Sequence, residues 1–194
     1  AAGLDAALPA KGGGHLEAAK LGAPSRAVVW LVGGRPVAVD PSGRGDPPLV
    51  PSVFALWSCP GLLPSVVLRS PDVATFLLGG ADLMLPGAAA AEGGWGSLHP
   101  GELRQVLCPG NPAAVAVGRV LLGPDEAAGG GRGRLLEILH HAGDALWPTF
   151  LPGEPCPRPN EGFVPRGDAR LEANRRLEGS PWSAVLPLAG EEGR

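Results

Sequence analysis

The stretch Leu78-Gly-Gly-Ala-Asp-Leu-Met-Leu-Pro-Gly87 decides the fold class of this chain. Before it, Ser70-Pro71-Asp72 predicts a helix start with proline at the first helical position, and Gly79-Gly80 predicts its end. An extended run over residues 82–85 follows, and Pro86-Gly87 then turns the chain sharply. Because Gly80 has no side chain, another backbone can approach closely here. The stretch therefore predicts a helix that passes directly into a strand and a tight turn.

Beyond this junction the sequence alternates between short apolar runs and Gly/Pro turns. Strands are expected over residues 103–107, 113–122 and 134–141, with one helical turn over 124–128 and a flexible loop, Gly129–Gly133. A short helical turn at Asp144–Trp147 closes the unit. Closely spaced short strands of this kind are typical of a small closed barrel.

Upstream of the junction the pattern predicts a hairpin and a helix. Two extended runs, residues 26–32 and 35–40, flank Gly33-Gly34, a pair typical of a primed turn. Pro36 has no N–H to donate, so the second strand is expected to be an edge strand or to begin there. A further strand is expected over 16–21. Ser52 is placed to cap a short helix that ends at Trp57.

Composition limits the classes of function. The 194 residues carry a net charge of −3 with a pI of about 5.8, and residues 75–150 hold four arginines against seven acidic residues. Bulk charge therefore gives nucleic-acid binding no support. Three widely spaced cysteines form no metal-ligand pattern and indicate a reducing compartment, and no apolar run is long enough to cross a bilayer. The first residue is Ala1 and the only methionine is Met84, which led us to expect a fragment.

Three pieces follow the helix in a fixed order. They are Gly80-Ala-Asp-Leu-Met-Leu-Pro-Gly87, Gly101-Glu102-Leu103 and Val115-Ala-Val-Gly118. Together they resemble the PUA domain, which occurs in RNA-modifying enzymes and in some translation factors. The resemblance implies a PUA pseudo-barrel over residues 70–150.

The resemblance extends upstream. Val50-Pro-Ser-Val-Phe-Ala-Leu-Trp-Ser-Cys-Pro-Gly-Leu-Leu-Pro64 is similar to the end of the pre-PUA domain of the malignant T-cell-amplified-sequence proteins and of the ligatin family of translation factors. Ala55-Leu56-Trp57, Gly110-Asn111 and Asp144-Ala-Leu-Trp147 are closer to the ligatin family, and the match runs from about Leu16 to Trp147. The implied fold class is α+β, mainly β. A truncated α/β pre-PUA unit (1–69) precedes the barrel, and a disordered tail (151–194), rich in Pro, Gly and charge, follows it.

For function, the resemblance implies RNA binding in the cytoplasm. The partners would be the small ribosomal subunit and the acceptor end of a tRNA, with mRNA involved indirectly, in tRNA delivery without GTP, in reinitiation or in recycling. No cofactor, no membrane and no small-molecule substrate is implied. Family members place lysine in the loop before the last strand, where this chain has Arg132 and Arg134. The RNA-binding positions carried over are Gly80, Ala81, Asp82, Leu83, Pro86, Gly87, Gly118, Arg132 and Arg134.

Other interpretations stay open at this point. The stretch from Gly80 to Gly87 is also consistent with a purely structural turn, and Asp82 with a carboxylate that binds its own backbone. Trp57 and Trp147 are expected in the core or at a domain interface, and Trp95 is expected to be exposed. The acidic balance favours a rival function, a protein-interaction module with little RNA contact. No phosphate-binding loop and no nucleophile elbow is present, so the chain is not expected to be an enzyme.

Overall fold

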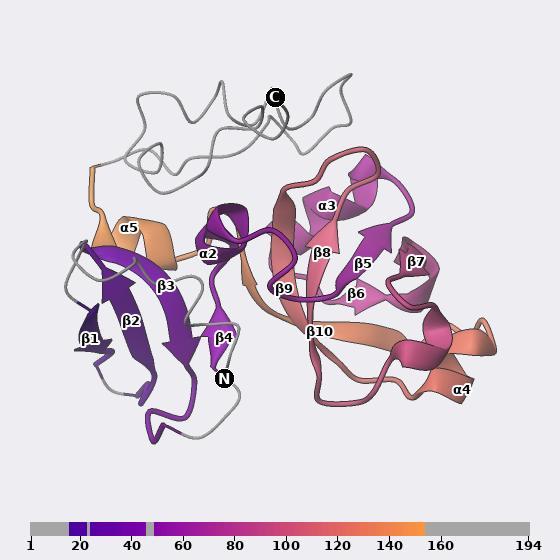
Figure 1. Ribbon diagram of the computed structural model, residues 1–194, viewed down its shortest axis with the longest axis horizontal. Helices are drawn as coiled ribbons and strands as arrows, with labels where there is room; N and C mark the ends of the chain where they lie inside the picture. The colour runs from indigo at the N-terminus through magenta and orange to yellow at the C-terminus, as the bar shows by residue number, and fades with distance from the viewer. Residues whose placement is uncertain (1–15, 23, 46–48, 154–194) are drawn as a thin grey trace, which may run out of the picture.

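The computed structural model describes residues 16–22, 24–45 and 49–153 as two β-sheets joined and flanked by short helices (Figure 1). The tail expected over 151–194 lies, from residue 154 on, outside the described residues. The architecture is mainly β, which confirms the expected fold class. No helix among the described residues has the length and apolar character needed to cross a bilayer.

The first sheet holds four strands in the order β1-β2-β3-β4. Its central hairpin turns at Gly33 and Gly34, whose φ angles are 56° and 78°, the left-handed values that a primed turn requires. β3 begins one residue before Pro36, close to the predicted start, but it is not an edge strand, because β4 pairs with Ala38 and Val39. The strands are β1 (Leu16–Lys20), β2 (Val28–Val32), β3 (Arg35–Asp40) and β4 (Val50–Pro51).

The helix α2 (Val53–Ser58) joins the two sheets. Ser52 caps it, because the hydroxyl accepts a hydrogen bond from the backbone N–H of Ala55 at 3.1 Å. The same hydroxyl donates to the carbonyl of Pro36 at 2.9 Å, which fastens the helix to β3. At the other side, the indole Nε1 of Trp57 donates to the carbonyl of Ala114 in the second sheet at 2.8 Å. α2 is thus tied to both sheets.

The second sheet has six strands in the order β6-β10-β9-β8-β5-β7 and forms a nearly closed pseudo-barrel. All its pairings are antiparallel except that of β5 with β8. The helix α3 (Pro71–Leu78) buries Ala74 and Leu77 and ends at Gly79, as predicted. The remaining elements are β5 (Ser65–Leu68), β6 (Leu83–Met84), η1 (Leu85–Gly87), β7 (Ala88–Ala91), η2 (Trp95–Ser97), β8 (Leu103–Leu107), β9 (Ala114–Val120), α4 (Pro124–Ala128), β10 (Arg134–His141) and α5 (Leu146–Phe150).

An aromatic cluster fills the junction between α2, β10 and α5. The ring of Phe54 lies 5.2 Å from Trp57, 5.1 Å from Trp147 and 5.9 Å from the imidazole of His140. Both tryptophans are buried, as expected. α5 also packs against β3, and the core of the barrel extends through α2 as far as Val50 of β4 in the first sheet.

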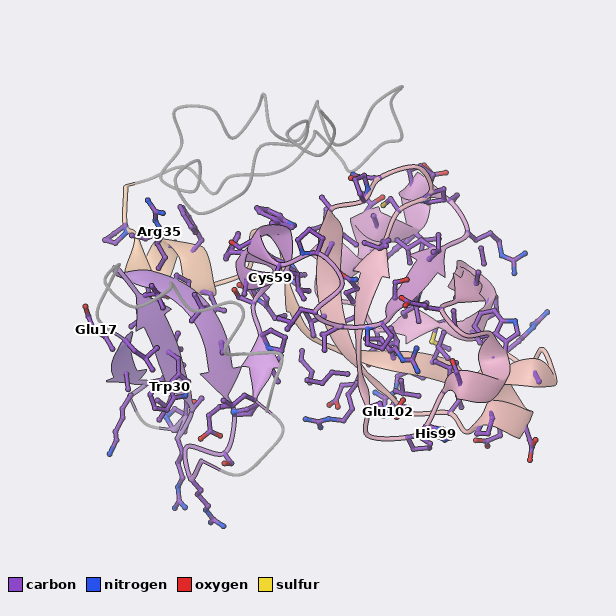
Figure 2. All side chains as sticks on the ribbon, viewed as in Figure 1. Glu17, Trp30, Arg35, Cys59, His99 and Glu102 are labelled. Atoms are coloured by element: carbon purple, nitrogen blue, oxygen red, sulfur yellow. The ribbon has the colours of Figure 1, made fainter. Side chains whose placement is uncertain are left out.

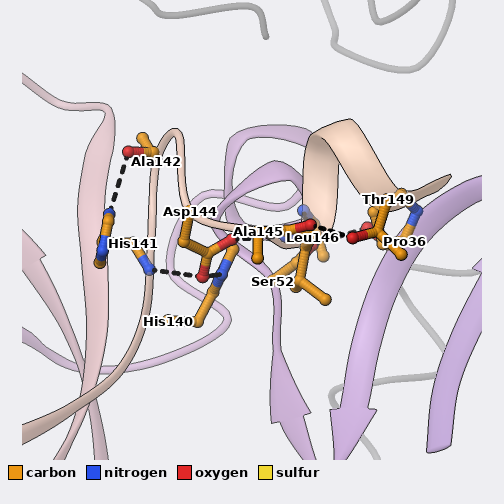
Figure 3. A network of polar contacts seen from close by, with 10 residues as sticks. Pro36, Ser52, His140, His141, Ala142, Asp144, Ala145, Leu146 and Thr149 are labelled. Carbon is orange, nitrogen blue, oxygen red and sulfur yellow. Dashed lines mark hydrogen bonds and ion pairs between the residues drawn. The ribbon is translucent and has the colours of Figure 1, made fainter. Parts of the chain in front are cut away.

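A contact between the buried imidazole of His140 and the partly buried carboxyl group of Asp144 supports this junction (Figure 3). His140 Nδ1 lies 2.5 Å from Asp144 Oδ2, and the backbone N–H of Leu146 donates to Asp144 Oδ1 at 3.0 Å. Burial alone raises the pKa of Asp144, but the hydrogen bond and charge of His140 and the backbone amides outweigh it, so the pKa is lowered overall. Asp144 is therefore held as a carboxylate at the start of α5.

Several elements differ from the sequence predictions. The strand expected over 82–85 is limited to Leu83–Met84, because Pro86 and Gly87 form η1 with Leu85. β5 and β7 were missed, and β5 belongs to the second sheet although it precedes residue 70. The last helical turn was expected to end at Trp147, but α5 runs from Leu146 to Phe150. Trp95, expected to be exposed, packs partly buried against the core.

Candidate nucleic-acid interface

Two segments far apart in the sequence meet at one edge of the second sheet. The backbone N–H of Leu85 donates to the carbonyl of Gly133 at 2.9 Å, and in the strand pairing Met84 lies opposite Arg134. The junction after α3 and the glycine-rich loop before β10 are therefore neighbours. These are the two segments that the sequence singled out.

Asp82 links these segments through its carboxylate. Oδ2 lies 2.9 Å from a guanidinium nitrogen of Arg134, and Oδ1 accepts a hydrogen bond from the backbone N–H of Ile138 at 2.8 Å. β10 shifts its pairing register on either side of this point. Asp82 thus binds the backbone of β10 and not its own, and it holds Arg134 in place.

Five of the predicted residues present atoms to the surface. Gly80 is exposed with a φ of +87°, and a Cβ built there meets nothing within 4 Å, so the space above this backbone is open. The Arg134 side chain is 57% exposed despite its ion pair. The exposed set is Gly80, Ala81, Pro86, Arg132 and Arg134.

Three other predicted residues shape the surface from below. Leu83 is fully buried in the core. Gly118 is buried where β9 and β10 approach closely, since a Cβ there would lie 2.9 Å from the Cβ of Leu136. Gly87 is half-buried, and its Cβ would lie 3.1 Å from side-chain atoms of Leu83 and of Val73 in α3. These positions require close packing and offer no side chain to a ligand.

Sequence reasoning missed two exposed residues at this edge. Arg69 donates from Nε to the carbonyl of Pro86 at 2.7 Å and from a terminal nitrogen to the carbonyl of Ala88 at 3.3 Å, so it fixes η1 while it remains exposed. Phe76 on α3 is 68% exposed. Arg69 lies in an apolar run without any motif, and an aromatic residue within a helix is normally assigned to the core, so neither residue gave a signal.

The electrostatics of this edge are mildly favourable to an anion, in contrast to the chain as a whole. Among the described residues, neither Arg69 nor Arg132 has a carboxylate within ion-pair distance. Arg134 forms an ion pair with Asp82, which partly neutralises its charge. The acidic residues Glu92 and Glu102 lie near η2, where Arg104 contacts both, and Figure 2 shows Glu102 beside His99 there. η2 packs against α4, whose first turn carries Asp125 and Glu126 shortly before the loop with Arg132. The edge therefore holds three arginines, two of them without an ion-pair partner among the described residues, in a chain that is acidic overall.

The described part of the chain gives no sign of a metal site, since no three His, Cys, Asp or Glu side chains are grouped to hold an ion. Within residues 16–22, 24–45 and 49–153, the one histidine–carboxylate pair, His140 with Asp144, lies at the junction between α2, β10 and α5. What remains at the surface is an open backbone, three guanidinium groups and exposed apolar side chains. Such a set is suited to binding an RNA strand by phosphate contacts and by stacking.

Comparison with protein families places residues 64–145 in the family described as "elF2D, PUA domain". The rat protein named Eukaryotic translation initiation factor 2D is 33% identical over 171 residues, which is 82% of this chain and 28% of that protein. Translation machinery-associated protein 20 of Schizosaccharomyces pombe is 29% identical over 107 residues, 55% of this chain and 59% of that protein. By their names, one relative is a translation initiation factor and the other is associated with the translation machinery, in agreement with the family resemblance seen in the sequence.

A solved structure agrees with the fold. A conserved PUA domain protein from Thermoplasma acidophilum superposes with a TM-score of 0.58 at 26% identity, covering 77% of this chain and 89% of that one. The pseudo-barrel that the sequence predicted is therefore confirmed as a PUA domain. The chain spans little more than a quarter of the length of the rat factor.

Proposed function

We propose, on the premise that this chain is related to the N-terminal region of translation initiation factor 2D and carries its PUA domain, that it binds the acceptor end of a tRNA. The binding surface consists of the open backbone at Gly80–Ala81, the turn at Pro86 and the arginines beside them. We call this set, Arg69, Gly80, Ala81, Pro86, Arg132 and Arg134, the RNA edge.

The observation that carries the proposal is the meeting of the two segments at Leu85 and Gly133. It gathers three exposed arginines around an accessible backbone in a chain that is acidic overall. A guanidinium group binds a phosphate through two parallel hydrogen bonds, so a few such groups suffice to position a strand. Binding would thus depend on the shape of this edge and on three arginines, and it would not need a large basic patch.

The wider role extends this proposal to the ribosome. The first sheet, joined to the barrel through α2, is the part we assign to contact with the small ribosomal subunit in the cytoplasm. tRNA held in this way would be delivered without GTP in initiation or reinitiation, or released in recycling, with mRNA contacted only indirectly. The relation to a translation initiation factor supports this role.

A protein-interaction module with little RNA contact is the competing function, and the net charge of −3 favours it. The two functions differ in their response to salt. Three arginines that bind phosphates of a single strand give a slope of about −2 in a plot of log affinity against log salt concentration. An apolar protein interface gives a slope near zero.

We therefore expect the chain to bind a labelled tRNA acceptor-stem hairpin with about that slope, measured by fluorescence anisotropy between low and physiological salt. An unlabelled hairpin should displace the labelled one. Absence of binding at low salt, or a flat salt dependence, would favour the protein-interaction module.

A further inference from the structure

The described residues leave three large apolar side chains well exposed, and two of them lie next to the RNA edge. Phe76 on α3 is 68% exposed and Met84 on β6 is 46% exposed, while the third, Leu16, lies on the first sheet. Single exposed apolar residues are common on protein surfaces.

Helix geometry places Phe76 on the flank of α3 that faces η1. Ala74 and Leu77 point into the core with exposed fractions of 0% and 1%. Val73 lies at the border of that face, since a Cβ at Gly87 would be 3.1 Å from its Cγ1. Residues three apart on a helix are surface neighbours. Phe76 therefore extends the same flank outward, and its backbone carbonyl accepts a hydrogen bond from the N–H of Ala81 in the RNA edge at 3.0 Å.

The arginines of the RNA edge are arranged around η1. Arg69 donates a hydrogen bond to the carbonyl of Pro86. The preceding residue, Leu85, donates its backbone N–H to the carbonyl of Gly133, in the loop that carries Arg132. The exposed ring of Phe76 thus lies on the helix that leads into the open backbone of the RNA edge, and the arginines lie along the turn and the loop beside that backbone. A nucleotide has a flat apolar base and a charged phosphate, and this arrangement matches both parts.

The ring and the phosphate sites are distinct for an electrostatic reason. Phe76 lies in the last turn of α3, where the helix presents the negative end of its dipole, and Asp72 lies one turn before it. A phosphate is disfavoured there, whereas an uncharged base is not. The phosphates belong beside the arginines and the base belongs on the ring.

We propose that the ring of Phe76 is the stacking surface for an unpaired base at the end of the bound RNA, which rests on the proposed function. Bases stack on aromatic rings regardless of sequence. This contact supplies affinity that does not depend on charge, in a chain whose net charge opposes RNA binding.

The test uses the full 194-residue chain and two RNA hairpins, one with four unpaired nucleotides at its 3′ end and one with a blunt end. Wild type is expected to bind the overhanging hairpin more tightly. Phe76→Ala should lose about ten-fold in affinity for that hairpin and little for the blunt one, because stacking on one base is lost. Phe76→Trp should retain wild-type affinity, whereas Phe76→Leu should behave like Phe76→Ala because it keeps apolar surface without a ring.

Leu16→Ala is the matched control, since it removes an exposed apolar side chain from the other sheet, and it should change neither affinity. Phe76 is exposed, so its variants are expected to fold. If wild type binds the overhanging hairpin but Phe76→Ala binds it equally well, or if Phe76→Leu restores the loss, stacking on Phe76 is refuted and RNA binding stands. If wild type binds neither hairpin, the proposed function itself fails.

Discussion

Replacing Phe54 with alanine is expected to lower the free energy of unfolding by about 3–5 kcal/mol, the range for truncating a fully buried aromatic side chain. Phe54 is 0% exposed and contacts Trp57, Trp147 and His140 from three different elements. Removing the ring leaves a cavity that the surrounding aromatic side chains fill only in part. Urea denaturation followed by tryptophan fluorescence measures the change.

Phe76→Ala provides the control for the Phe54 variant. It removes the same side chain from an exposed position, so the free energy of unfolding should change by less than about 0.5 kcal/mol. Because α2 is tied to both sheets, we expect Phe54→Ala to weaken the first sheet and the barrel together. A loss below about 1 kcal/mol, or a barrel that keeps its wild-type midpoint while the first sheet unfolds separately, would contradict the coupling of the two sheets through α2.

The second large effect is expected on RNA affinity. Reversing both loop charges with Arg132→Glu and Arg134→Glu should weaken binding of the acceptor-stem hairpin about one hundred-fold at low salt and make the salt slope shallower. Arg132 has no ion-pair partner among the described residues, so its reversal acts on the ligand alone. Arg134→Glu also places a second carboxylate beside Asp82.

Arg119→Glu is the matched control for this effect. Arg119 is also a partly exposed strand arginine in an ion pair, 3.2 Å from Glu137, but it lies on β9, which is separated from β6 by β10. Its reversal changes the net charge and breaks a pair of the same kind, so affinity should fall no more than about three-fold. If the single variants Arg119→Glu and Arg134→Glu lose the same RNA affinity, the overall charge of the chain and not the RNA edge determines binding.

Local signals in the sequence were sufficient for most elements. Proline at the first helical position, glycines at the helix end and the Gly33-Gly34 turn each fix backbone geometry within a few residues, and the structure confirms α3, its end and the hairpin. β5 and β7 were missed because neither carries such a signal. β7 is four alanines, which favour helices by propensity and form a strand only because β5 lies beside them.

The candidate site was predictable only in part, for a similar reason. Motif positions show where the backbone must be tight, and they do not separate residues that pack from residues that contact a ligand. Gly118 and Leu83 belong to the first kind. The ion pair of Asp82 with Arg134 joins residues far apart in the sequence, and no local pattern indicates it. Gly43, just after β3, is also a packing position, because a Cβ there would lie 1.8 Å from the carbonyl oxygen of Arg26.

The most direct test of the RNA edge is to locate where an RNA end touches the chain. An acceptor-stem hairpin with a photoreactive uridine analogue in its 3′ overhang would be cross-linked to the full chain, and the attached peptides identified by mass spectrometry. Cross-links are expected within residues 69–87 and 129–134, and competition with unlabelled hairpin should remove them. Cross-links confined to the first sheet, where Figure 2 shows Glu17 and Trp30, would contradict the proposed site.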